Sequence, residues 1–124
     1  MIIDTINITS LLKAFKKFEL FRNNLNTEQE QAGAIQAFEY CYELSWKTMK
    51  RFLEVRGKIA NSPREVFRMS ALEGFISDPE LWFDFIKKRN LTVHTYEEDD
   101  ALEVIKILPQ FSRAVTEFLR NIGA

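Results

Sequence analysis

The sequence predicts an all-α protein, folded as an antiparallel four-helix bundle with one additional short helix. Apolar residues recur with helical spacing along nearly the whole chain. Glycine and proline are scarce, with 4 and 3 copies, whereas phenylalanine has 11. A many-stranded β-sandwich would need turn residues about every 8–12 positions. The 124 residues contain no internal repeat, so residues 1–124 are expected to form a single domain.

The first two helices are predicted from residues 9–26 and from about Thr27 to Arg56. Thr9 or Ser10 is placed to cap the first helix, and Gly57 stands where the second needs a C-terminal cap. The apolar stripes consist of Leu11, Phe15, Phe18 and Leu25 in the first helix, and of Ile35, Phe38, Cys41 or Tyr42, Ser45, Met49 and Phe52 in the second.

Two helices that start with proline are predicted next. In the first, Ser62 can cap, Pro63 fits the first helical position and Glu65 completes a capping box; Gly74 ends this short helix. In the second, Asp78 and Pro79 repeat the device. One face of this helix is expected to carry Trp82, Phe85, Ile86 and Arg89.

The last helix is expected to begin near Thr95 and Glu98, which can form a further capping box. Pro109 lies inside this helix and should kink it or split it in two. The apolar stripe alternates spacings of three and four and consists of Ala101, Val104, Leu108, Phe111, Val115, Phe118 and Ile122.

The composition excludes several classes of protein. A net charge of −1 gives no global attraction to nucleic acid, so any such contact must use a local basic patch. Cys41 is the only cysteine and His94 the only histidine, so neither an intramolecular disulfide nor an all-protein zinc site is expected, and no cofactor is predicted. No apolar run approaches about 18 residues and the N-terminus lacks a basic start, so we expect a soluble, cytoplasmic protein without membrane contacts.

The segment KKRNLTVHTYEEDD, residues 87–100, contains the candidate site. Its basic and acidic runs suit the last turn of one helix and the first turn of the next, because each charge favours that end of the helix dipole. A capped helix–turn–helix therefore explains the charges. It does not explain why Arg89, Asn90, His94 and Tyr96 occur together.

Arg89 and His94 can converge only if the helix ends between them. A separation of five residues rotates a side chain by about 140° from its starting face in a continuous helix. The β-branched Thr92 and Val93, ahead of a cap at Thr95, favour such a break. A bent segment could then gather the polar side chains at one rim of the bundle.

Arginine and histidine together suit metal-independent cleavage of RNA. A guanidinium can bind phosphate through two parallel hydrogen bonds and stabilise the charge of the transition state. An imidazole can remove the 2′-OH proton or protonate the leaving oxygen. One protomer has a single histidine, so two histidines require a two-fold dimer with the site on its axis. Taken alone, a single arginine and a single histidine are more often structural.

The motif RNLTVHTY resembles the R-x4-H-x-Y form of the R-x4–6-H motif of HEPN domains, including the polar residue, Asn90, after the arginine. The chain resembles the nucleotidyltransferase substrate-binding subfamily, which is closely related to HepT-type toxins. Residues 33–54, 62–76 and 82–105 match that subfamily's segments in order and spacing, and the resemblance covers roughly residues 9 to 120.

The resemblance implies a helical bundle that forms a homodimer, with the motif in a cleft at the interface. It implies a small nucleotidyltransferase as partner and antitoxin, and RNA cleavage without metal. By position, Arg89 and His94 would be catalytic, Asn90 would assist, and Tyr96 would accept AMP from the transferase. A bulky charged adduct beside His94 would obstruct phosphate entry.

Two other interpretations remain open: a non-catalytic module that presents a nucleotide or other substrate to the transferase, and a purely structural dimeric bundle. The chain itself is not the transferase, because it lacks a Gly-Ser turn and paired carboxylates on a strand.

Further residues bear on these interpretations. Lys87 and Lys88 adjoin Arg89 and are candidate RNA or phosphate contacts. The pairs Lys47 with Arg51 and Arg64 with Arg68 would support RNA binding if they converge on the motif. Core packing is expected for Trp46, Trp82, Tyr42 and Cys41. A helix-surface or interhelical hydrogen-bonding role, rather than a metal site, is expected for Glu39 and Glu43.

Overall fold

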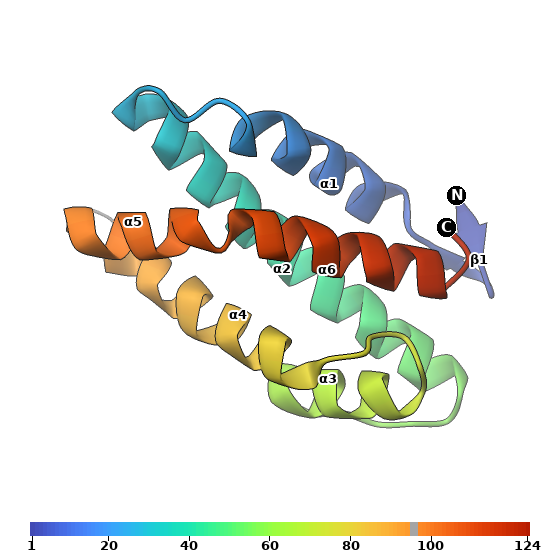
Figure 1. Cartoon of the computed structure of the whole chain (residues 1–124). Helices are drawn as coiled ribbons and strands as arrows, with labels where there is room; N and C mark the ends of the chain where they lie inside the picture. Colours follow the sequence, from blue (N-terminus) through green and yellow to red (C-terminus); the bar gives the residue numbers. More distant parts are fainter. Residues whose placement is uncertain (95–96) are drawn as a thin grey trace.

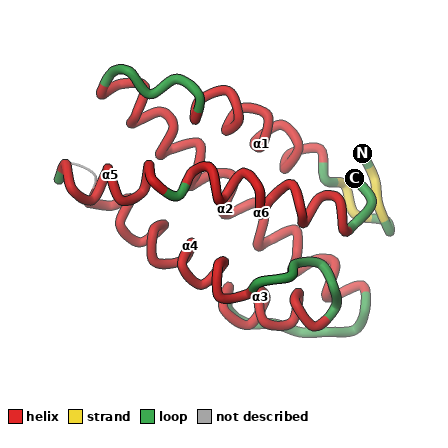
Figure 2. Tube along the Cα trace, viewed as in Figure 1, coloured by secondary structure: helices red, strands yellow, loops and turns green. Residues whose placement is uncertain are grey.

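The computed structural model describes residues 1–94 and 97–124, whose helices pack side by side in a bundle (Figure 1). Many of the largest buried side chains are aromatic. Within these residues the fold is helical apart from one β-hairpin, as the tube in Figure 2 shows. The elements are β1 (Ile2–Ile3), β2 (Ile6–Asn7), α1 (Thr9–Arg22), α2 (Glu28–Val55), α3 (Pro63–Leu72), α4 (Pro79–Leu91), a 3-10 turn η1 (Thr92–His94), α5 (Glu98–Lys106) and α6 (Leu108–Asn121). The all-α prediction with one short helix, α3, is confirmed for the body of the fold.

The N-terminal hairpin is the element that the sequence did not predict. Strands β1 and β2 pair antiparallel, with Ile3 opposite Ile6. Asp4 and Thr5 form the two-residue turn, and both have positive φ, at 50° and 71°. This matches the turn type that suits the twist of a tight hairpin, although neither residue is glycine. The strands are only two residues long, too short for an alternating pattern to be visible.

The expected caps of α1 are wrong. Ile8 occupies the N-cap position and makes no side-chain cap hydrogen bond, so Thr9 is already helical. The side chain of Asn7 accepts a hydrogen bond from the Thr9 backbone N–H at 3.0 Å instead. The Thr9 hydroxyl accepts from the N-terminal amine of Met1 at 2.8 Å. The hairpin therefore sets the start of the helix.

Helix α2 begins and ends close to the predicted positions. Thr27 and Glu30 form a reciprocal capping box. At the other end Gly57 has φ +75°, and the N–H groups of Gly57 and Lys58 donate to the carbonyls of Glu54 and Leu53. This pair of bonds is the Schellman motif, which favours glycine because of its left-handed backbone.

The caps of α3 and α4 confirm the predictions, with one difference. Ser62 accepts from the N–H of Glu65, and Asp78 from that of Leu81. The Glu65 carboxylate, however, accepts from the N–H of Asn61 at 2.8 Å and does not complete the box at Ser62.

The final helix is split, as Pro109 predicted. Helix α5 ends at Lys106 and α6 begins at Leu108, with Ile107 between them. Figure 1 shows α5 and α6 following one another across the face of the bundle. The start of α5 differs from the prediction, because Glu97 occupies its N-cap position. The expected cap at Thr95 lies outside the described residues.

Phe111 of α6 lies at the centre of the core and has no exposed surface. Its ring packs edge-on against rings of α1, α2 and α4, with centroid distances of 5.2 Å to Phe18, 4.9 Å to Phe38 and 5.2 Å to Phe85. Edge-to-face pairs of this kind add about 0.5–1.5 kcal/mol beyond their burial. Phe111 therefore joins α6 to α1, α2 and α4.

We predict that Phe111→Ala lowers the free energy of unfolding by about 3–5 kcal/mol, because it leaves a cavity that four helices cannot close. Urea denaturation measures this loss. Leu72, which is 82% exposed, supplies the control: Leu72→Ala should change stability by less than about 0.5 kcal/mol. Similar losses in both variants would contradict the central role of Phe111.

Candidate functional site

The helix ends between Arg89 and His94, as the candidate site requires. Helix α4 stops at Leu91, and Thr92, Val93 and His94 form the 3-10 turn η1. Thr92 is 7% exposed, and its hydroxyl donates to the Arg89 carbonyl at 2.7 Å while accepting from Arg89 Nη1 at 3.3 Å. Thr92 thus satisfies the helix end and orients the arginine, a role that the sequence pattern did not reveal.

Arg89 reaches across to two carboxylates of α2. Its Nη1 lies 3.9 Å from Glu39 Oε2, and its Nε lies 3.6 Å from Glu43 Oε1. All three side chains are between 29% and 35% exposed. Glu39 and Glu43 thus contact another helix as expected, but through ion pairs rather than hydrogen bonds. Residues 1–94 and 97–124 contain no group of three or more His, Cys, Asp or Glu side chains arranged to hold a metal ion.

The Glu43 carboxylate has two further neighbours, both on α2. Trp46 Nε1 donates to Glu43 Oε2 at 3.1 Å, and Lys47 Nζ lies 3.9 Å from the same oxygen. Trp46 packs against the core, as expected, but is only partly buried, so its indole N–H can donate to the carboxylate. Lys47 thus lies beside Glu43, which in turn lies beside Arg89 of the motif.

The remaining motif residues lie around the end of α4. Asn90 and His94 are exposed. Tyr96 lies outside the described residues. Among the described residues, the structure brings Arg89 together with the α2 carboxylates of Glu39 and Glu43.

The neighbouring basic residues differ from one another. Lys87 is exposed, whereas Lys88 lies between Asp84, at 3.7 Å, and Glu103, at 3.8 Å. Lys88 thus forms ion pairs with two carboxylates. Its role in binding phosphate stays a prediction, as does that of Lys87.

Arg64 and Arg68 of α3 converge on Phe83 of α4 rather than on Arg89. Their guanidinium carbons lie 4.4 Å and 6.0 Å from the ring centroid. Phe83 is six residues before Arg89, so this pair lies nearly two helical turns from the motif arginine.

A groove of about 630 Å³ opens beside Arg89. Its wall combines cations, carboxylates, an amide and aromatic rings from α1, α2 and α4. The lining residues are Ala14, Lys17, Phe21, Gly33, Gln36, Ala37, Glu39, Tyr40, Glu43 and Arg89. No sequence pattern indicated that Lys17 and Phe21 would share a groove with Arg89, because they lie on a different helix.

Two residues near the groove are unsuited to act as nucleophiles. Burial raises the pKa of the Cys41 thiol to about 12, although a hydrogen bond with Ser45 opposes this. Burial and the charge of Glu43 also raise the pKa of Tyr42, against the influence of Arg89. Both side chains are at most 2% exposed, which confirms their predicted place in the core.

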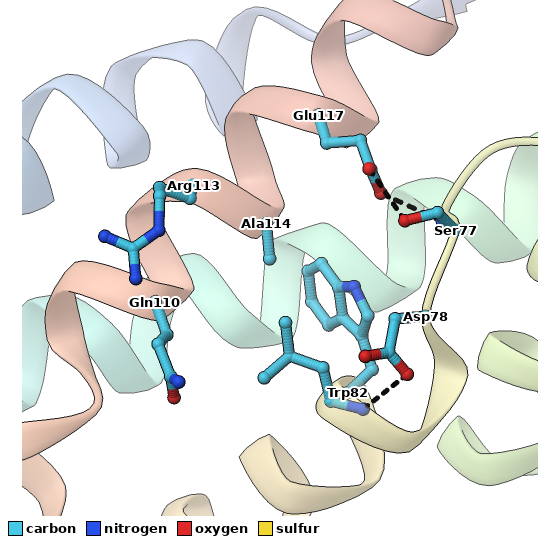
Figure 3. Close-up of a pocket in the computed structure, with 8 residues that line it drawn as sticks. Ser77, Asp78, Trp82, Gln110, Arg113, Ala114 and Glu117 are labelled. Atoms are coloured by element: carbon cyan, nitrogen blue, oxygen red, sulfur yellow. Dashed lines mark hydrogen bonds between the residues drawn. The ribbon is translucent and has the colours of Figure 1, made fainter.

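A second cavity, of about 220 Å³, lies between the start of α4 and α6 (Figure 3). Within it the Glu117 carboxylate accepts hydrogen bonds from the backbone and hydroxyl of Ser77, at 2.9 Å and 2.8 Å. Trp82 and Arg113 also line it. This cavity is at the end of α4 away from the motif, and the predicted site residues do not line it.

Comparison with known proteins identifies the family. The family model described as nucleotidyltransferase substrate binding protein like matches residues 6–123. The chain belongs to this family.

No helix in residues 1–94 and 97–124 has the length and apolar character needed to cross a membrane.

One relative is named as a ribonuclease, and one solved structure is described as a substrate binding domain. Probable ribonuclease HepT from Haemophilus influenzae is 35% identical over 85 residues, which are 64% of this chain and 58% of that protein. The match therefore spans less than two thirds of the relative's length. The family model covers more of this chain, residues 6–123.

Two solved structures share the fold over nearly the full chain. A protein from Thermus thermophilus has a TM-score of 0.85 at 29% identity, and the match covers 92% of this chain and 99% of that one. HI0074 from Haemophilus influenzae has a TM-score of 0.84 at 27% identity, with coverage of 95% and 100%. The latter structure is described as revealing the fold of a substrate binding domain of a nucleotidyltransferase.

We predict that Thr92→Val lowers the free energy of unfolding by about 1 kcal/mol, because the Arg89 carbonyl loses its hydroxyl donor while the side-chain shape is kept. Chemical denaturation measures the loss. Thr116→Val is the matched control, since the hydroxyl of the exposed Thr116 donates to the Ser112 carbonyl at 2.8 Å. An equal loss in the two variants would show that the end of α4 has no special dependence on Thr92.

Proposed function

We propose that this protein is the HEPN-type partner of a minimal nucleotidyltransferase and acts as a metal-independent ribonuclease toxin, controlled by AMP transfer to Tyr96. One observation supports this above the others. In a chain of this family, α4 ends between Arg89 and an exposed His94. The similarity to a protein named Probable ribonuclease HepT adds support.

The proposed chemistry assigns one task to each motif residue. His94 accepts the 2′-OH proton of the RNA, and the 2′-oxygen attacks the adjacent phosphorus. The 5′-oxygen leaves with a proton from the His94 of a second copy in a homodimer. Arg89 donates to the phosphate oxygens as negative charge develops, and Asn90 assists in holding them. The products are a 2′,3′-cyclic phosphate and a free 5′-hydroxyl.

The partner would act through Tyr96. In the proposed switch, the tyrosine hydroxyl attacks the α-phosphorus of ATP on the nucleotidyltransferase, and pyrophosphate leaves. The new phosphodiester brings a negative charge within two residues of His94 and repels the RNA phosphate. The role of Tyr96 rests on its place in the R-x4-H-x-Y sequence.

We predict that purified protein cleaves RNA in EDTA at low salt and that His94→Ala abolishes cleavage, because the imidazole is the proton carrier. Gel analysis of a labelled RNA measures the rate. Arg89→Ala should lower the rate by about 100-fold or more, as expected for loss of a charge-stabilising donor.

Arg113→Ala is the control for the loss of an arginine, since Arg113 lines the cavity at the far end of α4. It should cleave like the wild type. An unchanged cleavage rate in His94→Ala would contradict the proposed mechanism.

We predict that incubation with the cognate nucleotidyltransferase and ATP adds one AMP to the wild type and none to Tyr96→Phe. Intact-mass spectrometry measures the adduct. Tyr40, which is 58% exposed on α2, provides the control: Tyr40→Phe should still be modified. A mass gain that persists in Tyr96→Phe would show that another hydroxyl is the acceptor.

A second function is favoured by the description of HI0074 as a substrate binding domain. In this alternative, the protein is a non-catalytic subunit that presents a nucleotide or another substrate to the nucleotidyltransferase. The groove beside Arg89 would then hold the substrate. Absence of cleavage by unmodified wild-type protein, together with nucleotide binding that Arg89→Ala weakens, would favour this alternative.

A further inference from the structure

Arg89 is held by charge but keeps hydrogen-bonding capacity. Its Nε is buried and has no hydrogen-bond partner among the described residues. The separation of 3.6 Å from Glu43 and 3.9 Å from Glu39 exceeds the range of about 2.7–3.2 Å for an N–H···O hydrogen bond. A buried donor without a partner is uncommon and costs free energy. Neither carboxylate therefore lies at hydrogen-bond distance from Arg89, and an anion that comes within that distance would bind the guanidinium more strongly.

The two carboxylates differ in how firmly they are held. Glu43 also accepts from Trp46 Nε1 and lies near Lys47, so three groups fix its position. Glu39 contacts no cation other than Arg89 within residues 1–94 and 97–124. Glu39 is thus free to move at the loss of one weak ion pair.

The groove offers space for the anion on the same side. Arg89, Glu39 and Glu43 line it together with Lys17 of α1. The Lys17 ammonium lies 5.4 Å from the ring centroid of Phe21. Lys17 and Arg89 carry two positive charges, and Glu39 and Glu43 carry two negative charges, so the lining is neutral. A phosphate that enters the groove is repelled by the carboxylates. Glu39 is the less firmly held of the two.

We propose that these carboxylates act in opposite ways on Arg89: Glu43 is a positioning residue for the guanidinium, and Glu39 is the counter-ion that an RNA phosphodiester displaces. This inference rests on the proposed ribonuclease function. Once Glu39 is displaced from Nη1, the phosphate oxygens receive one N–H from Nη1 and one from Nη2 of Arg89 as a parallel pair, a geometry that a planar guanidinium favours. Glu43 stays in place and keeps the fork oriented.

The proposal predicts opposite effects for Glu→Gln at the two positions, Glu39 and Glu43. Glu39→Gln removes the competing charge and should tighten binding of a fluorescein-labelled 2′-O-methyl RNA oligonucleotide, which cannot be cleaved, by about two- to five-fold, the worth of a partly exposed ion pair. Fluorescence anisotropy at low salt measures the Kd. The gain should vanish when Arg89→Gln is also present.

Glu43→Gln should lower kcat for unmodified RNA by about 10- to 100-fold with a much smaller change in KM, because a misplaced guanidinium affects the transition state most. Trp46→Phe keeps an aromatic ring but removes the indole N–H that donates to Glu43, and should lower kcat by a smaller factor. Thermal unfolding followed by circular dichroism shows whether each variant folds. If Glu43→Gln does not fold, Trp46→Phe still tests the positioning role.

Glu54→Gln is the matched control, because Glu54 is an exposed glutamate on the same helix. Equal Kd values for Glu39→Gln and Glu54→Gln would overturn the counter-ion role, as would a gain that survives without Arg89. A wild-type kcat in both folded Glu43→Gln and Trp46→Phe would overturn the positioning role. Wild-type protein that binds the oligonucleotide but cleaves no RNA would refute the proposed ribonuclease function instead, while the Kd comparison still decides the role of Glu39.

Discussion

The packing of Phe111 against three other helices is the constraint on which the site depends. Its ring contacts Phe38 of α2 and Phe85 of α4 at the same time. Phe85 and Arg89 are one turn apart on α4, and Phe38 is next to Glu39 on α2. The aromatic contact thus fixes the separation of the two helices just where the guanidinium meets the carboxylates. Stability and site geometry are linked through one residue.

The ion pairs of Arg89 with Glu39 and Glu43 lie next to the aromatic core, and this determines which parts of the site can move. Close-packed aromatic rings resist displacement, so the backbones that carry Arg89, Glu39 and Glu43 are rigid. The side chains above them are about one third exposed and loosely paired. Exchange of one anion for another can therefore occur by side-chain motion alone, without movement of helices.

Local signals made much of the fold predictable. Pro63 and Pro79, each preceded by a capping residue, marked the starts of α3 and α4, and Gly57 marked the end of α2. Pro109 predicted the break before α6. The hairpin at residues 2–7 was missed because its strands are too short to show a pattern and its turn lacks glycine. The caps of α1 failed with it, since the hairpin places Ile8 at the helix start.

The sequence by itself determined the helical class, the end of α4 near Thr92 and the residue types of the motif, because capping and periodicity act over a few neighbouring residues. Only the tertiary structure decided which groups face Arg89. Glu39 and Glu43 lie about 50 residues earlier in the chain, and Lys17 reaches the groove from a third helix. Contacts of that sequence separation depend on how whole helix faces pack, which no local pattern specifies.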